Sequence, residues 1–282
     1  MKIAIASGKG GTGKSTVSVN YAWVLSKKYQ DIYLLDCDVE EPNCHIFLKS
    51  KLQEIKKVFL PVPHINSELC TGCGKCSELF EFNALACIKG KVIVFPELCH
   101  GCGGCMLVCP LHAIQETGRE IGIIEDGKVS NLNFIHGKLR IGEAMSPPLI
   151  KEVKKCTDNQ HIQIIDCPPG TSCPVISAIS GSDYVLLVTE PTPFGLYDLK
   201  LAVDMVRELK LPFGLIINKS GNNDYLIEEY ASSENIEIIT RILDDRRIAE
   251  AYSRGEIIVD AIPEYQEVFI PLLNLLESKV KR

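Results

Sequence analysis

The chain has 282 residues, of which 46% are hydrophobic and 23% are charged, a composition that allows one large or two modest globular domains. The net charge of −6 gives no support to nucleic-acid binding, and no window reaches the roughly 18 apolar residues that a membrane span needs, so neither partner is expected. Thirteen cysteines are unusual, and because the N-terminus leads into a strand-like run without a secretory leader, we expect them to bind metal in a reducing cytoplasm rather than to form disulfides.

A glycine-rich loop follows the first predicted strand. The apolar run Lys2–Ala6 precedes Ser7–Thr16, which reads SGKGGTGKST, and a helix-like run, Val17–Lys27, comes next. This order predicts a phosphate-binding loop, in which Lys14 supplies a charge for the outer phosphates of ATP and Ser15 a ligand for Mg²⁺. The alternative, a glycine-rich turn, leaves both lysines of the loop unexplained. The predicted nucleotide-binding residues are Gly8, Lys9, Gly10, Gly11, Thr12, Gly13, Lys14, Ser15 and Thr16.

Lys9 indicates which class of phosphate-binding loop this is. The stretch KGGTGKS at residues 9–15 resembles the deviant Walker loop of the MinD/ParA/Mrp class of P-loop ATPases, which includes the nitrogenase iron protein. In that class the early lysine reaches across a dimer to the nucleotide of the partner. The resemblance therefore implies ATP hydrolysis in a homodimer, with Lys9 and Lys14 as catalytic residues.

Two acids end the second predicted strand. The apolar run Ile32–Leu35 leads into Asp36 and Asp38, at the end of the strand where ligands bind in doubly wound sheets. Two carboxylates at this place suit Mg²⁺ and its water ligands; the alternative is a turn with solvated acids. The resemblance implies that Asp38 positions the attacking water, that Asp36 lies on the magnesium side, and that residues 40–43 form a switch segment.

Cysteine runs begin after the α/β rhythm stops at about Lys57. The spacing C-x₂-C-x₂-C occurs twice, and the second run continues as x₃-C-P, which is the bacterial ferredoxin pattern for [4Fe–4S] clusters. The two halves repeat at an offset of 29 residues. Paired CxxC knuckles also bind zinc, but the Cys-Pro ending and the repeat favour iron–sulfur clusters. The predicted ligands are Cys70, Cys73, Cys76, Cys99, Cys102, Cys105 and Cys109.

The second cluster departs from this pattern. In two-cluster ferredoxins the fourth cysteine of each run binds the other cluster, so Cys109 completes the first cluster, with Cys70, Cys73 and Cys76. Its counterpart 29 residues earlier is Phe80, followed by Glu81 in place of proline. Cys87 is one candidate for the missing ligand of the cluster on Cys99, Cys102 and Cys105. The alternatives are a three-iron or labile cluster, an outside ligand, or Cys87 as a small apolar residue in a strand.

The chain then returns towards the nucleotide domain. The region from Glu116 to about Arg140 has two short alternating runs, Ile121–Glu125 and Val129–Phe134, which predict hairpins. Ser146, followed by two prolines, opens a helix that extends to about Lys155.

A third strand ending in an acid, Ile162–Asp166, occupies the Walker B position, where Asp166 is expected to hold Mg²⁺ through water. Residues 167–174 resemble the DxPPG switch of Mrp-type proteins, which implies that the N–H of Gly170 senses the γ-phosphate. Cys173 has a spacing from Asp166 that resembles a cluster-ligating cysteine of the nitrogenase iron protein. A buried structural thiol is the favoured alternative, because a second ligand of that kind has no evident match.

The last third continues the α/β rhythm with strands at Tyr184–Thr189, Phe213–Ile217 and Ile236–Thr240. Asn218 follows the middle strand and resembles the adenine-reading residue of the class. The family's IPxD-like turn is replaced by residues 242–245, Ile-Leu-Asp-Asp, and the arginines at 246 and 247 favour a solvated helix start over an anion contact. The tail, Val268–Val280, has helical spacing; we favour a closing helix over a membrane-targeting one.

These observations predict an α/β fold: a doubly wound, mostly parallel sheet with an inserted small α+β ferredoxin-like domain. We expect the ATPase domain at residues 1–56 and 141–282 and the insert at 57–140. The expected function is electron transfer through [4Fe–4S] clusters, gated by Mg²⁺ and ATP, to a redox partner protein. The alternatives are a carrier that assembles iron–sulfur or metal centres on an acceptor protein, and a positioning ATPase.

Overall fold

The structure is a computed structural model that describes residues 1–79 and 83–280, with side chains as far as residue 275. Several residues on which predictions depend lie outside this part of the chain or have side chains outside it: Phe80, Glu81, Leu276, Lys279, Val280, Lys281 and Arg282.

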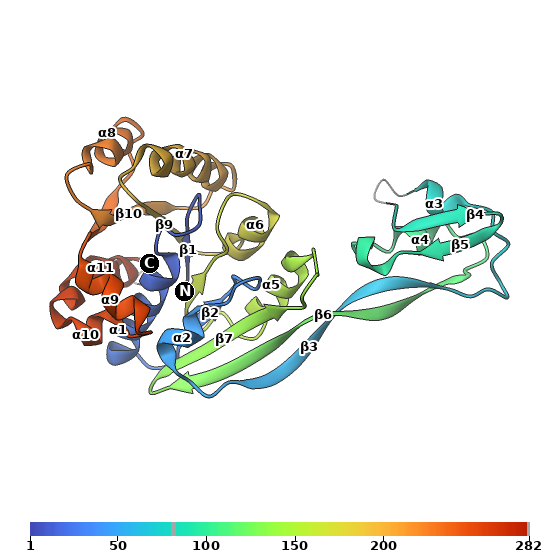
Figure 1. Ribbon diagram of the computed structural model, residues 1–282, viewed down its shortest axis with the longest axis horizontal. Helices are drawn as coiled ribbons and strands as arrows, with labels where there is room; N and C mark the ends of the chain where they lie inside the picture. Colours follow the sequence, from blue (N-terminus) through green and yellow to red (C-terminus); the bar gives the residue numbers. More distant parts are fainter. Residues whose placement is uncertain (80–82, 281–282) are drawn as a thin grey trace.

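The main sheet contains nine strands within the described residues: β1 Lys2–Ala6, β2 Ile32–Asp36, β3 Gln53–Ile65, β6 Ile114–Val129, β7 Leu132–Leu139, β8 Ile162–Asp166, β9 Tyr184–Thr189, β10 Phe213–Ser220 and β11 Ile238–Leu243. Their order across the sheet is β11-β10-β9-β1-β8-β2-β7-β6-β3 (Figure 1). The strands from β11 to β7 are all parallel, whereas β6 and β3 are antiparallel to their neighbours. The central strands are mostly apolar because both of their faces are covered, although β8 contains the buried Gln163.

Helices cover both faces of the parallel strands (Figure 1). One face packs against α5 Ser146–Lys154, α6 Cys173–Ile179, α7 Pro193–Glu208 and α8 Tyr225–Ser233. The other packs against α1 Lys14–Lys28, α2 Cys44–Leu48, α9 Arg246–Ser253, α10 Ile258–Ala261, the 3₁₀ helix η2 Pro263–Phe269 and α11 Ile270–Val280. The predicted doubly wound, mostly parallel α/β fold is therefore confirmed.

A long antiparallel ribbon leaves this sheet. Strands β3 and β6 pair from Gln53 and Asp126 near the sheet to Ile65 and Ile114 at the far end. The ribbon carries a small lobe, formed by residues 66–79 and 83–113, which lies away from the helices of the main sheet (Figure 1). We call it the cysteine lobe. Its elements are α3 Lys75–Glu78, β4 Leu85–Ile88, β5 Lys91–Val94, the 3₁₀ helix η1 Pro96–Leu98 and α4 Gly104–Val108.

The expected domain boundaries do not coincide with the ends of these elements. The position 56/57 falls inside β3, and β7, expected within the insert, pairs in parallel with β2 of the main sheet. The run Val129–Phe134, predicted as one hairpin strand, contains the turn itself at Ser130 and Asn131. Composition changes at Lys57, but strand pairing with β6 continues across it, and pairing is not visible in local sequence.

The tail is helical but begins differently from the prediction, because the α-helix α11 follows the 3₁₀ turn η2. Phe269 and Leu272 are almost fully buried in the core beside α1, which supports the closing-helix interpretation for the described side chains. Within residues 1–79 and 83–280, no helix has the length and apolarity that crossing a bilayer requires.

Candidate nucleotide site and cysteine sites

The glycine-rich loop connects β1 to α1. Gly11 and Gly13 have φ angles of 76° and 92°, a left-handed conformation that glycine adopts without a steric cost. Lys14 begins α1 and is only 6% exposed. The first turn of α1 carries no acidic side chain that would neutralise the positive end of the helix. The N–H of Gly170, expected near the γ-phosphate, donates to the carbonyl of Ser7 at 3.0 Å in this structure.

A cavity of about 460 Å³ lies over this loop. Parts of the loop, Asp38 and Asn218 line it together, although they are far apart along the chain. It also has a side that sequence reasoning missed, formed by Leu243, Ile248, Ala249 and Tyr252 from β11 and α9. Apolar side chains next to an amide suit a planar base, whereas the loop suits phosphates. Sequence reasoning missed this side because residues 242–245 depart from the turn of the family; in the structure, residues 242 and 243 are the end of β11.

Asn218 lines the cavity and contacts the glycine-rich loop. Its side chain is 7% exposed, and Nδ2 donates to the carbonyl of Thr12 at 2.7 Å. A Cβ atom on Gly13 would lie 2.2 Å from the same Nδ2. The amide therefore packs directly against the loop.

We expect Gly13→Ala to weaken binding of a fluorescent ATP analogue by about 10-fold or more, because a left-handed alanine costs about 1–2 kcal/mol and its Cβ would displace Asn218. Gly221→Ala is the matched control, since its Cβ would meet nothing within 4 Å. Equal affinities of the two variants would contradict the close packing of Asn218 on the loop.

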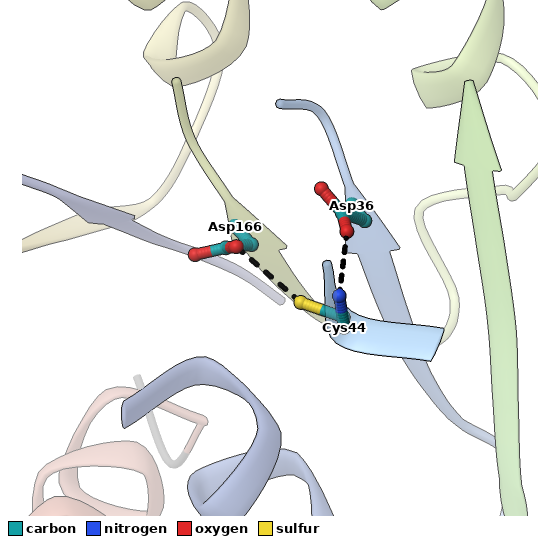
Figure 2. A group of neighbouring side chains, drawn as sticks. All are labelled: Asp36, Cys44 and Asp166. Carbon is teal, nitrogen blue, oxygen red and sulfur yellow. Dashed lines mark hydrogen bonds between the residues drawn. The ribbon is translucent and has the colours of Figure 1, made fainter. Parts of the chain in front are cut away.

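Three buried side chains that could bind a metal ion lie together at the ends of β2 and β8 (Figure 2). Asp36 and Asp166 are direct neighbours in the parallel register, and Cys44, at the start of α2, contacts both. The N–H of Cys44 donates to Asp36 at 3.0 Å and its thiol to Asp166 at 3.3 Å. Asp166 also accepts from the hydroxyls of Ser15 and Ser18, both at 2.7 Å. Cys44 and Ser18 were not predicted, because nothing in their local sequence indicates these contacts.

Asp36, Asp38 and Asp166 lie close together, so their carboxylates produce a negative electrostatic potential in a buried region. Burial, followed by the charge of Asp166, raises the pKa of Asp36 well above its usual range and the pKa of Asp38 to about 7. Lys14 acts in the opposite direction on Asp38 and Asp166. A divalent cation would stabilise the ionised carboxylates, and the serine and carboxylate oxygens are the hard ligands that Mg²⁺ prefers. The residues present therefore fit a magnesium ion.

Lys9 is held by its own chain. Its ammonium group lies 2.5 Å from Glu190, and the second carboxylate oxygen of Glu190 lies 2.9 Å from Lys219. Burial alone would raise the pKa of Glu190, but the two lysines lower it, so this acid is ionised between two cations. Glu190 was not predicted as a partner. The role of Lys9 across a dimer stays a prediction.

Four predicted ligands of the first cluster line one cavity in the cysteine lobe. Cys70, Cys73, Cys76 and Cys109 surround it, although Cys109 comes from the second cysteine run. Most of the remaining lining is apolar, as at Ile65, and Thr71 and Lys75 also line the cavity. Burial is the main reason that the pKa of Cys76 is raised, and the neighbouring thiols add to it. Four cysteine thiolates are the donor set that a [4Fe–4S] cluster requires.

The second cysteine run has a different surrounding. Cys99 and Cys105 are buried, whereas Cys102 is exposed. Cys87 does not stand with them: its thiol donates to the carbonyl of Gly72 at 3.3 Å, in the loop of the first run. The structure thus corrects the expectation that Cys87 completes the second cluster, because β4 holds it against the other loop.

Cys173 also differs from the favoured interpretation. It is exposed at the start of α6 and is therefore no buried structural thiol.

Comparisons with known proteins agree with the fold and the loop. The chain is 35% identical to an uncharacterized protein of Methanocaldococcus jannaschii, over 91% of this chain and 90% of that protein. It is 24% identical to a protein of Pyrococcus abyssi named iron-sulfur cluster carrier protein, over 98% of this chain and 87% of the relative. The cell division ATPase MinD of Pyrococcus furiosus has the same fold, with a TM-score of 0.63 at 20% identity, and the match covers 98% of each chain.

The family described as the CobQ/CobB/MinD/ParA nucleotide binding domain, CbiA, matches residues 3–259, which include the loop, both strand-end acids and Asn218. The chain therefore belongs to the CobQ/CobB/MinD/ParA family of nucleotide-binding proteins.

Proposed function

We propose that this protein is an ATP-dependent iron–sulfur carrier, which holds clusters in the cysteine lobe and passes them to an acceptor protein. The observation that carries this proposal is that one chain joins a P-loop cavity and a four-thiol cavity through a continuous strand, β6. The relatives named iron-sulfur cluster carrier proteins favour cargo transfer over electron transfer, although they are only about a quarter identical.

In the nucleotide domain, which comprises the main sheet and its helices, Lys14 and the loop amides bind the phosphates of ATP, and Asn218 reads the adenine. Mg²⁺ would be held by Ser15 and, through water, by Asp166 and Asp36, where it neutralises the phosphate charge. Asp38 orients the attacking water. Lys9 leaves Glu190 and reaches the nucleotide of a second copy, so that hydrolysis and dimer opening are linked.

In the cysteine lobe, a [4Fe–4S] cluster binds to the four thiols of the first cavity. The internal repeat and the Cys-Pro ending support a ferredoxin-like arrangement. A second cluster binds to Cys99, Cys102 and Cys105.

A row of contacts supports coupling between the two domains. Asp166, Asp36, His136 and Glu125 are successive partners across β8, β2, β7 and β6. His136 is 2% exposed, and its Nε2 lies 2.8 Å from Glu125 Oε2. His45, next to Cys44 in α2, packs edge-on against the ring of His136. A change at the magnesium site therefore has a contiguous route to β6, the strand that carries the lobe.

Cluster-loaded protein should donate its cluster to an apo-ferredoxin faster with MgATP than without nucleotide, as measured by visible circular dichroism of the acceptor. Lys14→Ala should lose this acceleration. His136→Phe keeps a ring of similar size but removes the contact with Glu125, so it should keep ATP hydrolysis and lose the acceleration.

The opposite result has a clear meaning. If MgATP shifts only the reduction potential and no iron reaches the acceptor, the carrier proposal is wrong and gated electron transfer replaces it.

A further inference from the structure

We infer that Cys99, Cys102 and Cys105 hold a cluster with one iron that no thiolate of this chain binds, and that this iron accepts a cysteine thiolate of the acceptor protein. The inference rests on the proposed function and names the exchange site within it. The four-thiol cavity is then the site that retains its cluster.

The two halves of the lobe repeat in conformation as well as in sequence. Gly72 and Gly101 have φ angles of 67° and 69°, Gly74 and Gly103 of 79° and 70°, and Asn83 and His112 of 52° and 49°. Each pair is separated by the same offset of 29 residues. Matching left-handed positions in non-glycine as well as glycine residues show that the backbone follows one path twice. Equivalent positions can therefore be compared directly.

This equivalence explains the position of Cys87. Its Cβ lies 3.9 Å from the place that a Cβ on Gly74 would occupy. Its counterpart 29 residues later is Glu116, whose Oε1 lies 3.5 Å from the corresponding place on Gly103. Each half thus places this side chain over its own cysteine loop. Cys87 belongs beside the first loop by the geometry of the repeat, and the second loop has a carboxylate at the same position.

No cysteine is left to complete the second site. All thirteen cysteines lie in the described residues: four line the first cavity, three form the second run, and Cys87 packs on the first loop. The remaining five, Cys37, Cys44, Cys156, Cys167 and Cys173, belong to the main body. Cys109 lines the first cavity, and its equivalent in the sequence is Phe80. A cubane at the second site would therefore have three protein thiolates.

The second site also faces solvent. Cys102 is exposed, and Leu107, in the helix that follows, is 87% exposed. An incoming cysteine binds the open iron as a thiolate and displaces solvent there, while its proton passes to bulk water and no electron is transferred. Exchange of this kind requires an iron with a replaceable non-protein ligand, which the first site with its four thiols does not offer.

The test uses the full chain, reconstituted anaerobically to about eight iron atoms, and a fluorinated benzenethiol followed by fluorine NMR. We expect one paramagnetically shifted thiolate signal per wild-type chain. Phe80→Cys should abolish the signal, because it supplies the missing thiolate. Cys87→Ser is the matched control and should leave both the iron content and the signal unchanged.

Three results would overturn the inference: a fully loaded wild-type chain without bound thiolate, a loss of iron in Cys87→Ser, or thiolate binding that begins only in Glu116→Gln, which would make the carboxylate the fourth ligand. Transfer to the acceptor is measured separately. A bound thiolate without MgATP-accelerated transfer would leave this assignment intact and refute the carrier function.

Discussion

Replacing Lys14 with alanine is expected to abolish nucleotide binding at micromolar concentrations. Lys14 is almost fully buried at the start of α1 and lines the cavity beside the loop. Two charge-assisted contacts to phosphate, each about 1.5–3 kcal/mol, correspond to at least about 100-fold in affinity. Isothermal titration calorimetry with MgATP measures this loss directly.

Lys27→Ala provides the control for the Lys14 experiment. Lys27 lies in the last turn of the same helix, where its exposed side chain pairs with Asp260. We expect its affinity for MgATP to match that of the wild type. Binding by Lys14→Ala within a few-fold of this control would remove Lys14 from the phosphate site.

In contrast to Lys14→Ala, Lys9→Ala should retain ATP binding but lose ATP hydrolysis. Lys9 does not line the cavity of its own described chain, so affinity should change little. A positive charge supplied across a subunit interface is typically worth about 10³-fold or more in kcat. Steady-state hydrolysis and the mass of the ATP-bound protein by light scattering measure both consequences, since the ATP-dependent dimer should also disappear.

Glu190→Gln separates the two partners of Lys9. It weakens the intrachain contact but leaves the lysine free to reach a second copy, so hydrolysis should persist. Normal ATP hydrolysis by Lys9→Ala would show that the role across the dimer is wrong.

The sequence was most informative where function requires a fixed local pattern. Strand, glycine loop and helix are adjacent in the chain, and the predicted runs Lys2–Ala6 and Ile162–Asp166 coincide with β1 and β8. Parallel strands buried on both faces must be continuously apolar, and their terminal acids stand out against that background. The acids Asp36 and Asp166 could therefore be predicted to lie at one edge of the sheet.

Contacts between distant segments could not be predicted in this way. Glu190 holds Lys9, and Tyr252 lines the nucleotide cavity, yet neither belongs to a recognisable local motif. The turn at Ser130 and Asn131 was missed because the residues on either side of it, Val129 and Leu132, are apolar. Only pairing with β6 and β2 reveals where β7 begins.

The cysteine sites include one feature that the sequence indicates and one that only the tertiary structure determines. The spacing of the cysteines alone indicated two cluster sites and a missing ligand, because three thiolates at C-x₂-C-x₂-C spacing can bind three irons of one cubane and the fourth comes from the other run. Only the tertiary structure decided that Cys87 packs on the first loop, since nearness in sequence to both runs does not determine which way a strand presents its side chain. Local chemistry is encoded by neighbours along the chain, whereas the choice between two equally near partners depends on how the strands pair.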